Sequence, residues 1–194
     1  MDTKKLSERQ TQIVDAALRI IASKGSRRFT AQLLAKDVGL TAGALYRHFA
    51  GMEEIVDAVV DRVEEILFDG FPPQAANPIE RLRLFFYRRA RTILDHPHIS
   101  RLLLSDHLAQ AGGVAQSKRL GEFKRRSQVF VSECLAEAHE HGLLANATSP
   151  EAGTVVVLGS ILALSHAAAR VANGAENERL FNEVWSGIER MLRR

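Results

Sequence analysis

The segment from Phe29 to Ile55 constrains the fold more than any other part of the chain, because it holds two short helical patterns joined by a glycine turn. Thr30 is placed to cap the first helix. Gly39 is placed to end it, since glycine adopts the positive φ of a helix C′ position without steric cost. Thr41 is placed to cap the second helix. Two helices joined by such a turn are typical of a helix-turn-helix, whose second helix enters the major groove of DNA.

The second helix can be laid out at about 100° per residue from Ala42. Leu45 and Phe49 then share one side, where they would pack on the first helix. Arg47 faces the opposite way and can offer a bidentate fork to guanine or pair with a phosphate, the commoner kind of contact. The remaining positions are small outward residues and polar flanking rings: Gly43 and Ala44 outward, Tyr46 and His48 on the flanks.

At these residues the segment resembles the TetR family of bacterial regulators, whose pattern is roughly T-x-x-x-I-A-x-x-x-G-V-S-x-G-x-L-Y-x-H-F-x-x-K. The resemblance in this motif covers only the first quarter of the chain. Met52 departs from the pattern, because the family usually has a lysine there, and the family's charge-assisted phosphate contact is not expected at that position. The matching residues are Thr30, Leu34, Ala35, Gly39, Leu40, Thr41, Gly43, Leu45, Tyr46, His48 and Phe49.

The resemblance implies that double-stranded DNA is the partner and divides the contact residues into two groups. It implies phosphate contacts from Thr30, Thr41, Tyr46 and His48, and base-facing positions at Gln32, Ala42, Gly43 and Ala44. Arg47 joins this candidate DNA-binding set from its outward position. The alternative is a helical hairpin with no role in DNA binding.

Charge is unevenly distributed along the chain. Residues 1–52 hold nine Lys and Arg against four Asp and Glu, whereas the remaining 142 residues hold 17 against 19. A basic patch on a nearly neutral body is expected of a nucleic-acid binder, because it steers association and releases counterions. Solvated surface charge alone would give the same count, so the charge supports the motif without replacing it.

Periodic apolar positions predict helices throughout, and no strand pattern is present, so we expect an all-α fold of about nine helices. A three-helix head with the helix-turn-helix (residues 1–51) is expected to precede a larger helical body for effector binding and dimerisation (residues 52–194). Helices are expected to begin at Ser7, Thr30, Thr41, Met52, Asn77, Pro97 and Ser149, with one ending at Gly142, the Ser149 helix reaching Asn173–Gly174, and a last one carrying Leu180 to Met191.

The segment 154–169 is apolar nearly all round, so a single amphipathic contact cannot bury it. The family resemblance implies that this helix and the C-terminal helix form a four-helix interface in a homodimer. The alternative is the central helix of a monomer. Candidate interface residues are Gly159, Leu162, Ala163, His166, Trp185 and Ile188.

Apolar and aromatic side chains of the body allow two interpretations, a small-molecule pocket and a solid core. The family resemblance implies an effector site among them; the effector itself is not identified. The arginines Arg81, Arg83, Arg88, Arg89 and Arg91 are spread around the helix that begins at Asn77, which favours solvated faces over one anion site. Candidate pocket residues are Phe85, Phe86, Leu103, His107, Phe123, Phe130 and Cys134.

Other chemistry is not indicated. The common nucleotide-binding and hydrolase motifs are missing, so we predict neither an enzyme nor a cofactor. The single cysteine excludes an intramolecular disulfide and a multi-cysteine zinc site. The His96/His98 and His139/His141 pairs would point about 200° apart on a helix and cannot share one metal ion. We expect no signal peptide and no membrane-spanning helix, hence a cytoplasmic, nucleoid-associated protein.

Two functions from different classes are consistent with these features. One is a sequence-specific regulator, a repressor released from a palindromic operator by a small-molecule effector. The other is a DNA-bound interaction protein that acts through a protein partner. Residues 25–30, the ALYRHF run and residues 99–103 resemble nucleoid-occlusion inhibitors of cell division within the same family.

Overall fold

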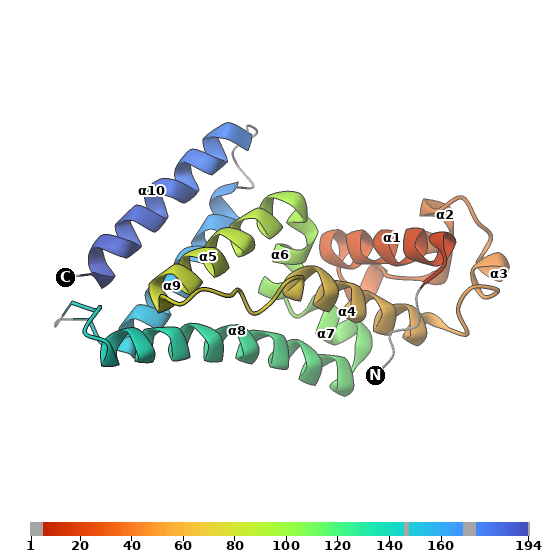
Figure 1. Cartoon of the computed structure of the whole chain (residues 1–194). Helices are drawn as coiled ribbons and strands as arrows, with labels where there is room; N and C mark the ends of the chain where they lie inside the picture. The colour runs from red at the N-terminus through yellow and green to blue at the C-terminus, as the bar shows by residue number, and fades with distance from the viewer. Residues whose placement is uncertain (1–5, 146–147, 169–173, 194) are drawn as a thin grey trace. The chain divides into compact units, whose positions relative to one another are not determined.

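The computed structural model describes residues 6–145, 148–168 and 174–193, and its regular elements are helices (Figure 1). No strand occurs within these ranges, so the all-α prediction is confirmed. The elements are α1 (Glu8–Lys24), the 3₁₀ helix η1 (Ser26–Arg28), α2 (Ala31–Asp37), α3 (Ala42–Leu45), α4 (Met52–Phe68), α5 (Pro78–Asp95), α6 (Pro97–Leu104), α7 (His107–Gly112), α8 (Val114–Glu140), α9 (Pro150–Ala168) and α10 (Gly174–Leu192).

The chain divides into two compact units. Unit 1 comprises residues 1–66 and 98–122, and unit 2 comprises residues 67–97 and 123–194. The helices α4 and α8 each contribute residues to both units. The division into functional domains at residues 51 and 52 stays a prediction.

The first helix of unit 1 begins where the sequence predicts. The Ser7 hydroxyl oxygen accepts the Gln10 N–H at 3.3 Å, and the Gln10 side-chain oxygen accepts the Ser7 N–H at 3.0 Å, which completes a capping box. The apolar stripe of α1 is buried, with Ile13 and Ile21 fully shielded from solvent. On α4, Ile55, Val59 and Val63 are equally buried, so α1 and α4 both supply apolar residues to the centre of unit 1.

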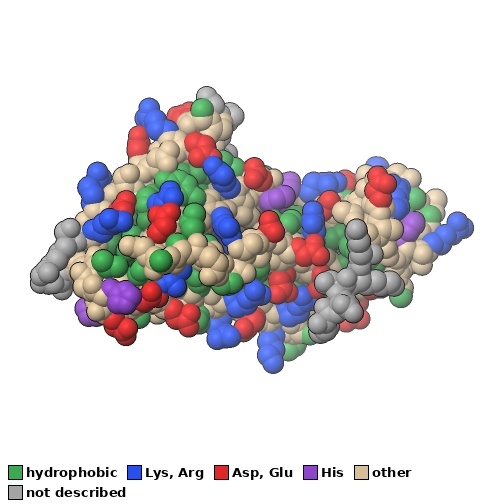
Figure 2. Space-filling view, viewed as in Figure 1, with side chains coloured by type: hydrophobic (Ala, Val, Ile, Leu, Met, Phe, Trp, Pro, Cys, Tyr) green, Lys and Arg blue, Asp and Glu red, His purple; other side chains and the backbone are tan. Residues whose placement is uncertain are grey.

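Unit 2 is built around one hydrophobic core. Asn77 caps α5 by accepting the Ile79 N–H at 2.8 Å, with Pro78 at the first helical position. Phe86 and Trp185 meet in this core with ring centroids 5.4 Å apart. Hydrophobic side chains also gather on the face between α5 and α10, as Figure 2 shows.

Ten α-helices among the described residues replace the predicted nine because one expected helix is broken. The continuous pattern from Pro97 to Gly112 was expected to form a single helix, but α6 ends at Leu104 and α7 begins at His107. At the break, the Ser105 hydroxyl accepts the His107 N–H at 3.5 Å. A serine side chain competes with helical hydrogen bonding by offering the backbone a local partner, which explains a break at this point.

The α9 helix departs from a second expectation. Residues Pro150–Ala167 are long and apolar enough to cross a membrane by length and composition, although we expected no such helix, and only 22% of that window is buried in the structure. The predicted end of the helix near Asn173–Gly174 falls on residues 169–173, which lie outside the described ranges. A long apolar helix with little burial needs a further partner on its open side.

Candidate nucleic-acid interface

The two predicted helix caps of the helix-turn-helix are present. The Thr30 hydroxyl oxygen accepts the Leu33 N–H at 3.2 Å, and the Thr41 hydroxyl oxygen accepts the Ala44 N–H at 3.1 Å. Both threonines are exposed. Each hydroxyl proton is therefore available to donate outward, beside helix N-terminal N–H groups that favour an anion.

The turn between α2 and α3 is closed by the glycine that the sequence identified. Gly39 has a φ of 66°, and its N–H donates to the Lys36 carbonyl at 3.3 Å. The Leu40 N–H donates to the Ala35 carbonyl at 2.8 Å, which completes a Schellman motif. This geometry returns the chain to the start of α3 within four residues.

The segment expected to enter the major groove, residues 42–48, is called the recognition segment below. Its α-helix is shorter than predicted, and its last turn is tighter. The α-helix ends at Leu45, where a longer regular helix was expected. The Arg47 N–H donates to the Ala44 carbonyl at 3.2 Å and the His48 N–H to the Leu45 carbonyl at 3.0 Å, both with the i to i−3 spacing of a 3₁₀ turn. Such tightening is common at helix C-termini, and it rotates residues 46–48 away from their ideal α-helical positions.

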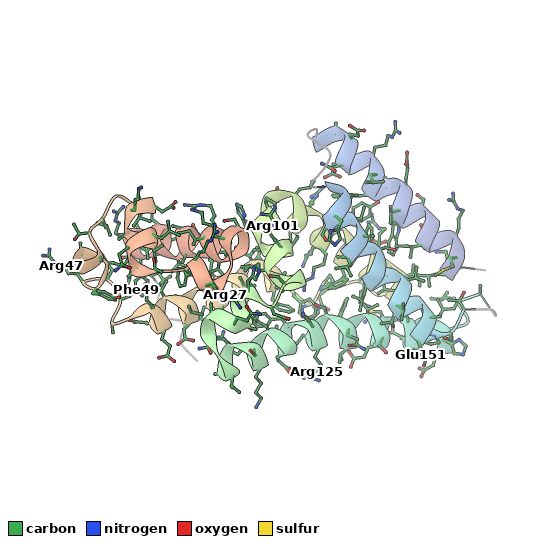
Figure 3. All side chains as sticks on the ribbon, turned by 180° about the vertical axis from the view of Figure 1, so that it is seen from behind. Arg27, Arg47, Phe49, Arg101, Arg125 and Glu151 are labelled. Carbon is green, nitrogen blue, oxygen red and sulfur yellow. The ribbon has the colours of Figure 1, made fainter. Side chains whose placement is uncertain are left out.

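The inward and outward sides of this segment nevertheless agree with the prediction. Leu45 is fully buried and Phe49 is 3% exposed. Figure 3 shows Phe49 directed among the helices and Arg47 directed away from them. Exposed residues of the candidate DNA-binding set are Thr30, Gln32, Thr41, Gly43, Tyr46 and Arg47, and half-buried ones are Ala42, Ala44 and His48.

Two side chains at the start of α1 hold this motif in place, and the sequence did not reveal them in that role. The Arg9 guanidinium donates to the Val38 carbonyl at 2.7 Å, at the end of α2. The Gln10 side-chain amide donates to the His48 carbonyl at 2.9 Å, at the end of the recognition segment. Gln10 was recognisable only as a capping-box residue; its second bond joins positions 38 residues apart, which local patterns do not show.

Met52 lies half-buried at the start of α4 and lines a surface groove of about 580 Å³. The groove also contains Phe29 and Val56, with Arg27 and Glu53 as its charged residues. The family's usual lysine at this position is thus replaced by an apolar side chain that contributes to a mixed polar and apolar groove. We therefore still expect no charge-assisted phosphate contact from position 52.

The predicted pocket residues do not all fall in one part of the molecule. Leu103 and His107 belong to unit 1, whereas the other five belong to unit 2. In unit 2, Phe85, Phe86 and Cys134 are each no more than 2% exposed within the hydrophobic core. Phe123 is 3% exposed and Phe130 is half-buried. The pocket stays a prediction, and the candidate residues that can still line it together are the five that belong to unit 2.

Arg89 contradicts the prediction that the α5 arginines form solvated faces. It is 8% exposed and donates to the Leu67 carbonyl and to the Ser127 hydroxyl, the latter at 3.1 Å. Burial lowers the pKa of Arg89 to about 10, and the positive charge of Arg126 acts in the same direction. By contrast, Arg88 and Arg91 are exposed, as expected.

The candidate dimer residues separate into an exposed group and a buried group. Gly159, Leu162, Ala163 and His166 are exposed on α9, and nothing lies within 4 Å of a Cβ built on Gly159. Val155, 72% exposed, extends this surface. The two candidates on α10, Trp185 and Ile188, are buried within the same chain at 3% and 4% exposure.

Comparisons with known proteins agree with this architecture. Residues 13–59 match the family described as bacterial regulatory proteins, tetR family. The nucleoid occlusion factor SlmA of Marinomonas sp. is 32% identical over 108 residues, which are 54% of this chain and 55% of that protein. The chain therefore spans about half of that relative's length. The transcriptional repressor KstR2 of Mycobacterium tuberculosis is 28% identical over 141 residues, 71% of this chain and 70% of that protein.

Solved structures show the same fold along nearly the whole chain. The structure of KstR2 superposes with a TM-score of 0.78 at 17% identity and covers 98% of this chain and 97% of that one. AibR in complex with isovaleryl coenzyme A and operator DNA gives a TM-score of 0.72 at 20% identity, covering 95% of this chain and 98% of that one. At these identities the likeness concerns the fold.

Proposed function

Because the chain belongs to the TetR family of bacterial regulatory proteins, we propose that it is a repressor that binds a palindromic operator as a homodimer and is released by a small-molecule effector. The family is regulatory, and DNA binding is its shared activity. The observation that carries the proposal is the exposed helix-turn-helix with both threonine caps formed. Such a protein would work in the cytoplasm, on the nucleoid.

The proposed contacts follow the two sides of the recognition segment. The exposed hydroxyls of Thr30, Thr41 and Tyr46, together with His48, would hold phosphates and fix the register on the duplex. The small outward residues Ala42, Gly43 and Ala44 would let the backbone approach the bases. Gln32 and Arg47 would supply the polar readout, since an amide pairs with adenine and a guanidinium with guanine in the major groove.

Dimerisation is supported by the open side of α9. Val155, Gly159, Leu162 and His166 recur at intervals of four, three and four residues and are all exposed, so they form one continuous stripe. Apolar exposure on this scale marks an interaction surface. A second copy of the same helix fits it, because Gly159 permits close approach and a two-fold axis would place two heads on two half-sites.

Effector release is supported by the repressor KstR2 and by AibR, which share the fold and, in the case of AibR, bind both isovaleryl coenzyme A and operator DNA. We propose that the helical body of this chain binds a small molecule of its own. A ligand that prefers a conformation with altered head spacing would lower operator affinity by its differential affinity for the two states.

Selection of bound DNA from a random double-stranded pool tests the core of the proposal. The expected result is an inverted repeat with half-sites about one helical turn, or a multiple of it, apart. Light scattering on the free protein tests the dimer separately. Enrichment of no motif, or of a single unpaired half-site bound by a monomer, would contradict a dimeric operator-binding repressor.

A second candidate function is a nucleoid-bound inhibitor of cell division. The observation that favours it is the 32% identity with SlmA, although only 55% of that protein is covered. Overproduction in a bacterial host distinguishes the two functions. A division inhibitor would give filamentous cells in every medium, whereas a repressor of a few operators would leave cell length unchanged and alter only the genes next to its selected sites.

A further inference from the structure

The groove that Met52 lines lies entirely within unit 1, and the proposed DNA contacts do not use it. Its volume of about 580 Å³ falls within the roughly 300–1,000 Å³ of pockets that enclose small organic ligands. Three segments form it: η1 with the turn that follows, the start of α4 and the end of α7. A small molecule of moderate size therefore has room to bind there.

Close contacts hold the walls of the groove together. The Ser26 hydroxyl donates to the Gln110 side-chain oxygen at 3.2 Å, which joins η1 to α7. A Cβ built on Gly112 would lie only 2.8 Å from Cγ1 of Val56, so glycine at this position allows the end of α7 to approach α4 this closely. The groove is therefore preformed by contacts within unit 1.

The floor of the groove is apolar and consists of Phe29, Met52 and Val56. Val56 is 2% exposed, and the other two side chains are half-buried. Met52 stands where the TetR pattern usually has a lysine, so the departure from that pattern leaves the floor without a charge. Such a floor stabilises a ligand by removing the ligand's apolar groups from water.

Polar groups surround this floor. Arg27 and Glu53 line the groove, are exposed and carry opposite charges. Within the described residues, neither side chain forms an ion pair or a hydrogen bond. Ser26 occupies only the oxygen of the Gln110 side chain, and no described acceptor takes the two N–H donors of its amide nitrogen. The groove thus offers a cation, an anion and an amide donor.

We propose that this groove binds a small apolar zwitterion of the size of a dipeptide. Its carboxylate would pair with Arg27 and its amino group with Glu53, both through charge-assisted hydrogen bonds. Its amide carbonyl would accept from Gln110, and its apolar side chains would cover the floor. The backbone of a segment inside a longer protein chain has neither terminal charge, so the two charges favour a free dipeptide over a protein partner.

The groove contacts both ends of the helix-turn-helix along the chain. Phe29 directly precedes the Thr30 cap, and Met52 begins the helix that follows the recognition segment. A ligand carboxylate on Arg27 would also offset a positive charge three positions before Thr30, a proposed phosphate contact. Ligand and operator should therefore weaken each other's binding by the same factor. This consequence, unlike the ligand site itself, rests on the proposed function.

Four probes test the site by calorimetry on the full-length protein: Leu-Phe, its N-acetyl form, its C-terminal amide and the form blocked at both ends. Acetylation removes the positive charge and amidation removes the negative charge, while the apolar side chains stay. An exposed ion pair contributes about two- to fivefold in affinity. Each single block should weaken binding by about that factor, and the double block by about tenfold.

Variants assign each charge to its partner. Arg27→Gln should remove the preference for Leu-Phe over its amide and keep the preference over the acetyl form, whereas Glu53→Gln should do the reverse. Arg28→Gln is the control for the first, since Arg28 is exposed in the same 3₁₀ helix but does not line the groove. Glu8→Gln is the control for the second, because Glu8 is exposed in the first turn of α1 as Glu53 is in that of α4. Both controls should keep both preferences.

Met52→Gln tests the floor and should weaken all four probes alike, because every probe keeps its apolar side chains. Equal binding of the four probes by the wild type, absence of Leu-Phe binding, or preferences that survive in Arg27→Gln and Glu53→Gln would overturn the site. Both charge variants change exposed side chains, so loss of folding is not expected of them.

The effect on DNA is measured by fluorescence anisotropy with the selected operator, with and without saturating Leu-Phe. Operator affinity should fall about fivefold or more, the lower end of typical coupling between two sites. Unchanged affinity would overturn the regulatory consequence. Loss of all duplex binding by the ligand-free protein would overturn the proposed function, whereas calorimetry without DNA decides the ligand site by itself.

Discussion

Replacing Gln10 by glutamate should separate the two bonds that this side chain makes. Its oxygen accepts the Ser7 N–H at 3.0 Å, and its amide nitrogen donates to the His48 carbonyl at 2.9 Å. Glutamate keeps the first bond, since a carboxylate also completes a capping box. It cannot make the second, because an ionised carboxylate has no proton to donate. Gln10→Glu therefore releases the end of the recognition segment without removing the α1 cap.

The magnitude follows from one lost bond and one new repulsion. A hydrogen bond contributes about 0.5–1.5 kcal/mol net, and leaving a carbonyl opposite a carboxylate adds to that loss. A loss of about 1.4 kcal/mol corresponds to roughly tenfold in an equilibrium constant. We expect Gln10→Glu to lower operator affinity by about this factor, because residues 46–48 would no longer be held at the register that the duplex requires.

Gln12→Glu provides the matched control. Gln12 is exposed on the same helix, and its oxygen accepts a bond from Arg9 at 2.7 Å, which glutamate retains. Both variants add one negative charge near the proposed DNA surface, so their difference isolates the bond to His48. Affinity is measured by fluorescence anisotropy with the selected operator, and stability by urea unfolding. Equal operator affinity of the two variants would refute the proposal that the hydrogen bond from Gln10 to the His48 carbonyl supports DNA binding.

Four further outcomes follow from the structure. Tyr46→Phe should weaken binding to all DNA sequences alike in competition experiments, because a flanking hydroxyl holds phosphate; a changed base preference would contradict this. Gln32→Ala should relax the preference at one position per half-site by about tenfold in a binding-site selection, whereas uniform weakening would indicate phosphate contact only. Gly159→Arg should yield a monomer by light scattering, and Gly121→Arg, at an exposed glycine of α8 with equal free space, should leave the dimer intact. Burial raises the pKa of Cys134 to about 11, above its ordinary value of 9, so the folded thiol should resist iodoacetamide at pH 8, and stability should fall between about pH 9 and 11 as the unfolded thiol ionises first.

The sequence predicted those parts of the head that depend on neighbours within a few residues. The caps at Thr30 and Thr41 and the positive φ of Gly39 involve partners at most five positions away. Burial of Leu45 and Phe49 likewise follows from their four-residue spacing. The sequence is sufficient in these cases, because a helix cap or a turn depends on hydrogen bonds between residues that are close along the chain.

The spacing of apolar residues does not predict three other features of the structure. The break between α6 and α7 lies inside a continuous apolar pattern, where helix and turn differ by the hydrogen bonds of a single serine. The contraction after Leu45 converts a predicted helix into i to i−3 turns. Arg89 was indistinguishable from four other arginines on α5, since its burial depends on a backbone carbonyl and an aromatic ring that both come from the end of α4, Leu67 and Phe68.

The missed residues share one physical cause. Every helix leaves carbonyls without partners at its C-terminal end, and a glycine signal shows where the helix ends but not what satisfies those carbonyls. Here Arg9 and Gln10 donate to carbonyls that end α2 and the recognition segment, and Arg89 donates to Leu67 at the end of α4. All three donors come from other helices. A sequence examined over a few neighbouring residues therefore does not show which donor satisfies these carbonyls.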